Sequence, residues 1–253
     1  MKTIIFHEHT TAHSPSHRYI VLFLKKYIEK IEAAQNYELD DELMEFYVSL
    51  AATTDLSAGA SGMCYKTYTL DKEQYAKVVL HEEQMMISQG TTGLQTWEAS
   101  LRLADFFIEH PGFACAAVGA AHVLSTDCSA AVLKLLEHNR QKNPAFKDKL
   151  QVAELDWEHT DECSKLSDTA DVVIGADITY DPTIVPMLVD ALKAMVSSSQ
   201  QVAQVPTMRK DMAHMNASGV LGKSVMDLSE TKMTTLCHPN PTADIRLVLI
   251  TRK

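Results

Sequence analysis

Glycine is scarce in the 253-residue chain, which contains nine glycines and no Gly-x-Gly pair. An oxidoreductase that uses a dinucleotide cofactor needs a glycine fingerprint after its first strand, so this class is the least favoured. Cysteine is also scarce: the five cysteines are widely spread and show neither a CxxC pair nor metal-ligand spacing with histidine. Such cysteines favour reduced thiols in a cytosolic or nuclear compartment over a secreted disulfide framework.

Basic residues do not predominate, since the formal net charge is −10. A nucleic-acid partner is therefore not expected, because proteins that bind nucleic acids carry a basic surface. Long hydrophobic runs are absent as well. The run Tyr19–Leu24 is far too short for a membrane span, and Met1–Phe6 has too short an apolar core for a signal peptide. We expect a cytoplasmic protein without a membrane partner.

The first sixteen residues are polar and contain His7, His9 and His13. A loosely ordered terminus is favoured over a metal site here, because no ordered frame holds the three imidazoles in place. Further along, apolar residues recur at helical spacing over His17–Ala34 and again over Asp40–Leu50, which predicts two amphipathic helices. The sequence thus indicates an N-terminal helical region.

The N-terminal region is assigned to residues 1–85 and a second domain to residues 86–253. From residue 120 the second domain alternates apolar runs with helical patterns. Strands are expected at Val123–Asp127, Leu150–Leu155 and Asp171–Asp177, and helices at Ser129–Arg140 and Thr183–Met195. Two antiparallel strands are expected to close the chain, at Ser224–Ser229 and Asp244–Thr251. Strands that alternate with helices predict an α/β fold with a parallel, doubly wound sheet.

Polar and aromatic residues follow three of the predicted strands in succession. Ligands in open α/β sheets bind beyond the carboxyl ends of the strands, which is where Asp127, Trp157 and the pair Asp177 and Tyr180 stand. Asp127 is suited to ribose hydroxyls, and Trp157 could stack on a purine. Each residue alone has a plainer interpretation, since an isolated strand-end Asp more typically caps the next helix. Three such strand ends together favour a binding edge.

A turn with Gly90 and Gly93 precedes Trp97 and a predicted helix that ends at Glu109. Backbone N–H groups at such a turn could face an anionic group. The signal is weak alone, because many helices begin with Gly and Thr as caps, and a Trp in the first turn of a helix is usually a core residue.

Three motifs together resemble a known family: Gly90-Thr-Thr-Gly-Leu-Gln-Thr-Trp97, Leu155-Asp-Trp157 and Ala176-Asp-Ile-Thr-Tyr180. They are similar to those of the seven-strand, S-adenosylmethionine-dependent protein-lysine methyltransferases, which have a Rossmann-like sheet. The N-terminal helices, residues 64–68 and the tail from Leu236 narrow the resemblance to the branch that methylates a lysine of translation elongation factor 2. The similarity runs from about residue 40 to the end.

This resemblance implies roles for six residues. Trp97, Asp127, Trp157 and Ala176 would contact S-adenosylmethionine, and Asp177 and Tyr180 would face the substrate lysine. The implied chemistry is coherent, because methyl transfer requires a neutral amine while free lysine has a pKa of about 10.4. A carboxylate would orient the amine, an aromatic side chain would help to desolvate it, and positioning would supply most of the rate. The enzyme is expected to be a monomer with a protein substrate.

One departure from the family is large. The first strand of the sheet and its glycine loop belong between His110 and Asp127, but residues 111–126 contain no Gly-x-Gly. A second gap is expected near Ser197–Met208, where the fifth strand should stand. We therefore expect an incomplete sheet with unpaired strand edges. The alternative to an enzyme is a catalytically inactive, internally deleted family member, which would act as a binding module through its N-terminal helices.

Overall fold

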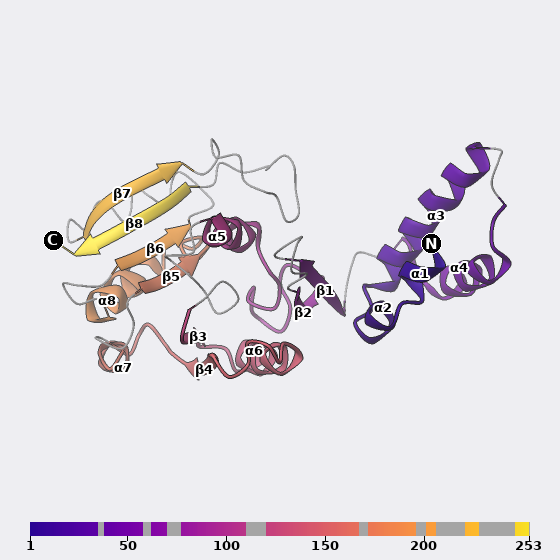
Figure 1. Cartoon of the computed structure of the whole chain (residues 1–253). Helices are drawn as coiled ribbons and strands as arrows, with labels where there is room; N and C mark the ends of the chain where they lie inside the picture. Colours follow the sequence, from indigo (N-terminus) through magenta and orange to yellow (C-terminus); the bar gives the residue numbers. More distant parts are fainter. Residues whose placement is uncertain are drawn as a thin grey trace. The chain divides into compact units, whose positions relative to one another are not determined.

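The computed structural model describes residues 1–34, 38–57, 62–69, 77–109, 120–166, 172–195, 201–205, 221–227 and 246–252 (Figure 1). The chain forms two compact units, one of Met1–Tyr68 with Lys77–Gln95 and one of Thr69–Ala76 with Thr96–Lys253. The predicted domains, 1–85 and 86–253, stay predictions, because a domain is defined by independent folding and a compact unit only by its packing.

The first unit contains helices and one two-stranded sheet: α1 (Lys2–Ile5), α2 (Glu8–Ala12), α3 (His17–Ala33), α4 (Asp41–Thr53), β1 (Met63–Thr69) and β2 (Lys77–Glu83). The helix caps follow from local chemistry. The Ser16 hydroxyl accepts the N–H of Tyr19 at 3.2 Å, and the Asp40 carboxylate accepts the N–H of Leu43 at 3.1 Å. These bonds satisfy donors that the first turn of a helix leaves unpaired. The two predicted amphipathic helices are confirmed as α3 and α4.

The prediction of a loosely ordered N-terminus is wrong. Ile5 is buried in a cluster with Ile20, Leu24 and Leu43, and Lys2 forms an ion pair with Asp40 at 2.9 Å. These contacts come from residues distant in the sequence, so short helices that would be unstable alone are held in place. Among the described residues, no group of three His, Cys, Asp or Glu side chains is placed to hold a metal ion.

The second unit alternates strands and helices: α5 (Glu98–Glu109), β3 (Val123–Asp127), α6 (Ala130–Lys142), β4 (Leu150–Glu154), α7 (Thr160–Ser164), β5 (Val172–Ala176), α8 (Val185–Met195), β6 (Gln201–Val205), β7 (Leu221–Asp227) and β8 (Arg246–Arg252). Strand β3 pairs with β4 in parallel, and β5 pairs with β6 in parallel. Strand β8 lies between β6 and β7 and is antiparallel to both (Figure 1). The predicted α/β class and the closing antiparallel strands are confirmed.

A gap was expected near residues 197–208, but the described part of that segment, residues 201–205, forms a strand. Strand β6 stands there and pairs with β5 on one side and β8 on the other. Its sequence, Gln-Val-Ala-Gln-Val, continues a stretch of low complexity and is too short to predict a strand when it is read alone. The hydrogen bonds from two neighbouring strands define β6, and these neighbours are not visible in a local pattern.

The sheet of the second unit is divided. Strands β3 and β4 form one sheet, and β5, β6, β8 and β7 form another in that order, so no strand among the described residues joins β3 to β5. The resemblance to the family implies that the first strand, which we expected to be missing, would stand at this break. Residues 110–119, where the glycine loop was sought, lie outside the described residues.

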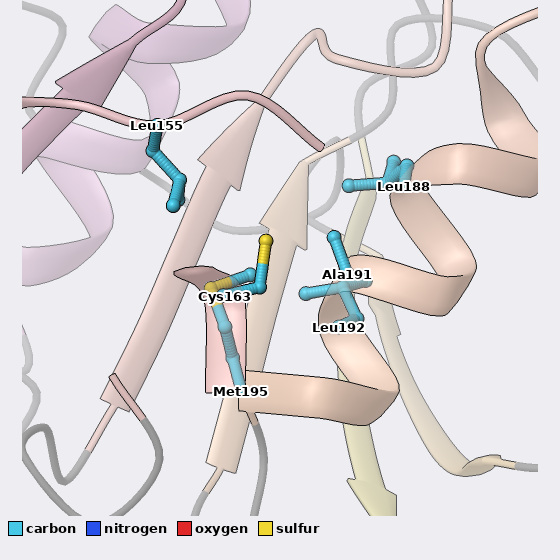
Figure 2. Close-up of a cluster of buried hydrophobic side chains, with 6 residues drawn as sticks. All are labelled: Leu155, Cys163, Leu188, Ala191, Leu192 and Met195. Atoms are coloured by element: carbon cyan, nitrogen blue, oxygen red, sulfur yellow. The ribbon is translucent and has the colours of Figure 1, made fainter. Parts of the chain in front are cut away.

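A buried hydrophobic cluster of the second unit lies between helices α7 and α8 (Figure 2). Figure 2 shows Leu188, Ala191 and Leu192 of α8 directed toward Cys163 of α7. The burial of each leucine stabilises the fold by about 1.5–3 kcal/mol, so α8 is held by packing rather than by helix propensity. The remaining members are Leu155 and Met195, and partly buried neighbours are Trp157, Leu166, Val173, Ile178 and Ala194. None of the helices described is long and apolar enough for a membrane span.

Candidate active site

The segment after β5 has an unusual backbone. β5 ends at Ala176, which is aligned with Val205 of β6, and the next residue, Asp177, has a φ of +59°. A left-handed conformation is uncommon for a residue with a Cβ, although Asp tolerates it better than most residues. Such conformations are frequent at functional sites, where the surrounding structure holds them. The chain therefore turns sharply at the residue that the resemblance assigns to the substrate lysine.

Three residues that follow Asp177 differ in their exposure. Ile178 packs against the cluster between α7 and α8 and anchors the segment. Thr179 is 1% exposed, and its hydroxyl has no hydrogen-bond partner among the described residues. Tyr180 is 59% exposed, so its phenol ring is available to a substrate. Nothing in the local pattern indicates that the Thr179 hydroxyl is buried, because a threonine in a polar segment is usually exposed.

Asp181 closes the turn that leads into α8, whereas the plainer role considered for Asp177 was a helix cap. The Asp181 carboxylate accepts the Thr183 backbone N–H at 2.9 Å and the Thr183 hydroxyl at 2.7 Å. These hydrogen bonds hold the pKa of the Asp181 carboxyl below its usual value. Helix α8 begins at Val185, two residues later than predicted, because this turn precedes it. The carboxylate at position 177 is thus not needed to form this turn.

The end of β3 positions Asp127. One carboxylate oxygen of Asp127 accepts the N–H of Ser129 at 2.8 Å, and its carbonyl accepts the N–H of Leu155 at 3.1 Å. The side chain therefore helps to turn the chain toward α6 and keeps its second oxygen for another donor. Burial, together with the negative charges of Asp127 and Asp156, raises the pKa of the Cys128 thiol. The ends of β3 and β4 are therefore close together and acidic.

Trp157 follows β4 and links two strand ends. It is partly buried and packs on the same cluster as Ile178, the neighbour of Asp177. The segments after β4 and β5 therefore converge on one side of the core. The contact also gives the indole ring a structural role in the core.

Trp97 precedes α5, and its carbonyl accepts the N–H groups of Ser100 at 3.0 Å and Leu101 at 3.3 Å. The preceding turn belongs to the other unit. There Gln89 and Gly90 both have positive φ, and Ser88 and Thr91 exchange two backbone hydrogen bonds. This is the geometry of a two-residue type I′ hairpin. The predicted anion-binding turn thus uses the N–H of Thr91 within the turn itself.

The residues fit one end of S-adenosylmethionine better than the other. Asp127 has a carboxylate oxygen available for ribose hydroxyls, and Trp157 presents a partly exposed ring from the adjacent strand end. No Gly-x-Gly loop exists in the sequence to surround the methionine end. The structure brings the strand-end residues Asp127, Trp157, Ala176, Asp177 and Tyr180 into one unit with Trp97.

Parallel strand pairs with interleaved helices define a Rossmann-like α/β fold. Residues 110–217 match the family described as lysine methyltransferase. Protein-lysine N-methyltransferase EEF2KMT of Mus musculus is 31% identical over 232 residues, which cover 80% of this chain and 67% of that protein. The chain belongs to this family of protein-lysine methyltransferases.

One further relative and one solved structure are also similar to this chain. Protein-lysine N-methyltransferase EFM3 of Chaetomium thermophilum is 31% identical over 218 residues, which cover 72% of this chain and 65% of that protein. The chain thus spans about two thirds of the length of the curated relatives that it matches. A solved structure, the fibrillarin pre-rRNA processing protein of Methanococcus jannaschii, aligns with a TM-score of 0.38 at 10% identity, over 52% of this chain and 56% of that one.

Proposed function

We propose that this chain is an S-adenosylmethionine-dependent protein-lysine N-methyltransferase that acts on translation elongation factor 2. The match to EEF2KMT over two thirds of that protein's length carries the proposal. The retained Asp177-x-x-Tyr180 motif at the end of β5 supports it. A cytoplasmic location belongs to the same proposal and agrees with the three described cysteines, Cys64, Cys128 and Cys163, none of which is in a disulfide.

In this proposal the residues of the chain bind and orient the reactants. Asp127 and Trp157 hold the adenosine end of the cofactor, with Ala176 and Trp97 beside it. The cofactor supplies an electrophilic methyl group. Asp177 accepts a hydrogen bond from the substrate amine and orients it, and the exposed ring of Tyr180 excludes water from its flank.

A second candidate is a binding module without catalysis. The observation that favours it is the break between β3 and β5, which leaves the described strands without the element that should carry the glycine loop. A chain of this kind would bind the translation factor through the helices of its first unit and transfer no methyl group.

Calorimetric titration of the purified protein with S-adenosylhomocysteine separates the two candidates. We expect binding that is lost in Trp157→Ala, because the stacking surface is removed. Leu166→Ala is the matched control, since Leu166 packs on the same cluster but follows no strand end. A Leu166→Ala protein that is folded and binds the ligand assigns the loss to the indole ring rather than to weaker packing.

A methylation assay with purified elongation factor 2 then tests the activity. We expect methyl transfer by the native chain and its loss in Asp177→Asn, which should still bind S-adenosylhomocysteine. A folded native protein that binds no S-adenosylhomocysteine would overturn the enzyme proposal. Capture of elongation factor 2 by that same protein would then support the binding module.

A further inference from the structure

Thr179 stands between the two residues that the proposed function assigns to the substrate, Asp177 and Tyr180. It is 1% exposed, and its hydroxyl has no hydrogen-bond partner among the described residues. A buried polar group without a partner destabilises a fold, and a valine would fill the same space without this cost. Native proteins contain few such groups, and functional sites are among the places that keep them. The hydroxyl of Thr179 is therefore a candidate for a functional role.

The same spacing of aspartate and threonine occurs twice in succession, as Asp177-Ile-Thr179 and as Asp181-Pro-Thr183. In the second pair, the Asp181 carboxylate accepts the Thr183 hydroxyl at 2.7 Å and the Thr183 N–H at 2.9 Å. An aspartate side chain can thus reach the hydroxyl of a threonine two residues later. In the first pair, the hydroxyl of Thr179 makes no such bond. The chain therefore contains one closed and one open form of the same pair.

The open pair lies in a segment that is held at several points. Asp177 is half-buried and has a φ of +59°, and Ile178 packs on the cluster between α7 and α8. A side chain that orients a substrate has to be kept within a narrow range of directions, and hydrogen bonds from neighbours that are themselves locked by packing do this. Thr179 is such a neighbour, because it is buried and still has a donor to give.

We propose that Thr179 is a positioning residue for the carboxylate of Asp177: its hydroxyl donates to one carboxylate oxygen while the substrate amine binds at the other. This inference rests on the proposed function. A carboxylate has about four lone-pair sites, so it accepts both donors and keeps its contacts within the chain. The open pair thereby takes the arrangement that Asp181 and Thr183 already have.

The burial of Thr179 determines how it acts. At 1% exposed, its hydroxyl is out of reach of the substrate, so its effect passes through Asp177. Loss of the hydroxyl should therefore have two opposite consequences. The fold should gain stability, because an unpaired buried group is removed, and methyl transfer should slow, because the carboxylate is no longer held in one direction. A threonine that only fills space would show the first consequence without the second.

Steady-state methylation of elongation factor 2 and urea unfolding test the proposal. We expect Thr179→Val to lower kcat about tenfold or more, as the loss of one hydrogen bond to a charged group would. The same variant should keep its KM for S-adenosylmethionine and unfold at a higher urea concentration than the native chain. Thr179→Ser keeps the hydroxyl and should retain most of the native kcat. Thr183→Val is the matched control, since it removes the hydroxyl of the closed pair and should leave kcat near that of the native chain.

The outcomes separate this proposal from the proposed function. A native chain that transfers no methyl group would overturn both. Methyl transfer by the native chain with an unchanged kcat in Thr179→Val would overturn only the role of Thr179. A Thr179→Val protein less stable than the native chain would also overturn it, because the hydroxyl would then be paired already. If Thr179→Val does not fold, Thr179→Ala takes its place beside Thr179→Ser, and an equal kcat in these two variants would count against the hydroxyl.

Discussion

The left-handed backbone at Asp177 allows its conformational and chemical roles to be separated by substitution. With a φ of +59°, a β-branched residue at this position should lose about 1–2 kcal/mol, so Asp177→Val should unfold at lower urea concentration. Asn tolerates this conformation as well as Asp does. Asp177→Asn should therefore keep its stability within about 0.5 kcal/mol. Asp177→Gly removes the backbone strain of the folded state, but glycine also raises the conformational entropy of the unfolded chain. The two effects oppose each other, so the stability of this variant should also change little.

Urea unfolding followed by tryptophan fluorescence measures these differences. Both tryptophans, Trp97 and Trp157, lie in the second unit, so their signal reports on the unit that contains Asp177. In the methylation assay, Asp177→Asn and Asp177→Gly should both lose activity by about 100-fold or more, because neither orients the amine with a carboxylate. Equal stability of the Val and Asn variants would refute the argument from backbone strain. Full activity of Asp177→Asn would refute the role of the carboxylate.

Two further predictions concern stability and pH. Leu188 is 1% exposed, so Leu188→Ala should destabilise the second unit by about 2–5 kcal/mol in urea unfolding, whereas Asp190→Ala on the exposed side of the same helix should change it little. Hydrogen bonds from Arg140 and Gln141 lower the pKa of Glu137 from 4.5 to about 2. Because this folded-state pKa is depressed, the contribution of Glu137 to stability is present above pH 4.5 and is lost as the pH falls toward 2. An NMR titration should show the Glu137 pKa rising toward its ordinary value in Arg140→Gln, and an unchanged pKa would contradict the prediction.

The helices and strands that the sequence predicts well have a strong local pattern. The buried residues Ile20, Leu24 and Ile28 recur at helical spacing along α3, and the apolar run of β5 is bounded by turn residues. Helices α1 and α2 were missed because their stability comes from distant partners, such as the contact of Ile5 with Leu43 in one cluster. A local pattern contains no information about such partners.

The candidate site was predictable in its residue types and positions but not in its backbone geometry. The motif places Asp177 at a strand end, yet only the fold shows that the chain turns there through a left-handed conformation. The plainer interpretation assigned the turn into the next helix to Asp177, whereas Asp181 makes the hydrogen bonds of that turn; two acidic residues four apart look equivalent in sequence. The burial of Thr179 depends on packing between elements, which the local sequence pattern does not indicate.

The break in the sheet has different consequences for cofactor binding and for catalysis. Asp127 ends β3 and Trp157 follows β4, and the hydrogen bond from the Leu155 N–H to the Asp127 carbonyl joins these two strand ends. The adenosine surface of the proposed function therefore does not require the first strand. Methyl transfer needs more, because under the proposed function the amine that Asp177 would orient has to be aligned with the cofactor to within a fraction of an ångström. Among the described residues, the ends of β4 and β5 are linked only through Trp157 and Ile178, which pack on the same cluster. No described strand lies between the two sheets. Turnover should therefore fall further below that of complete family members than the affinity for S-adenosylhomocysteine does.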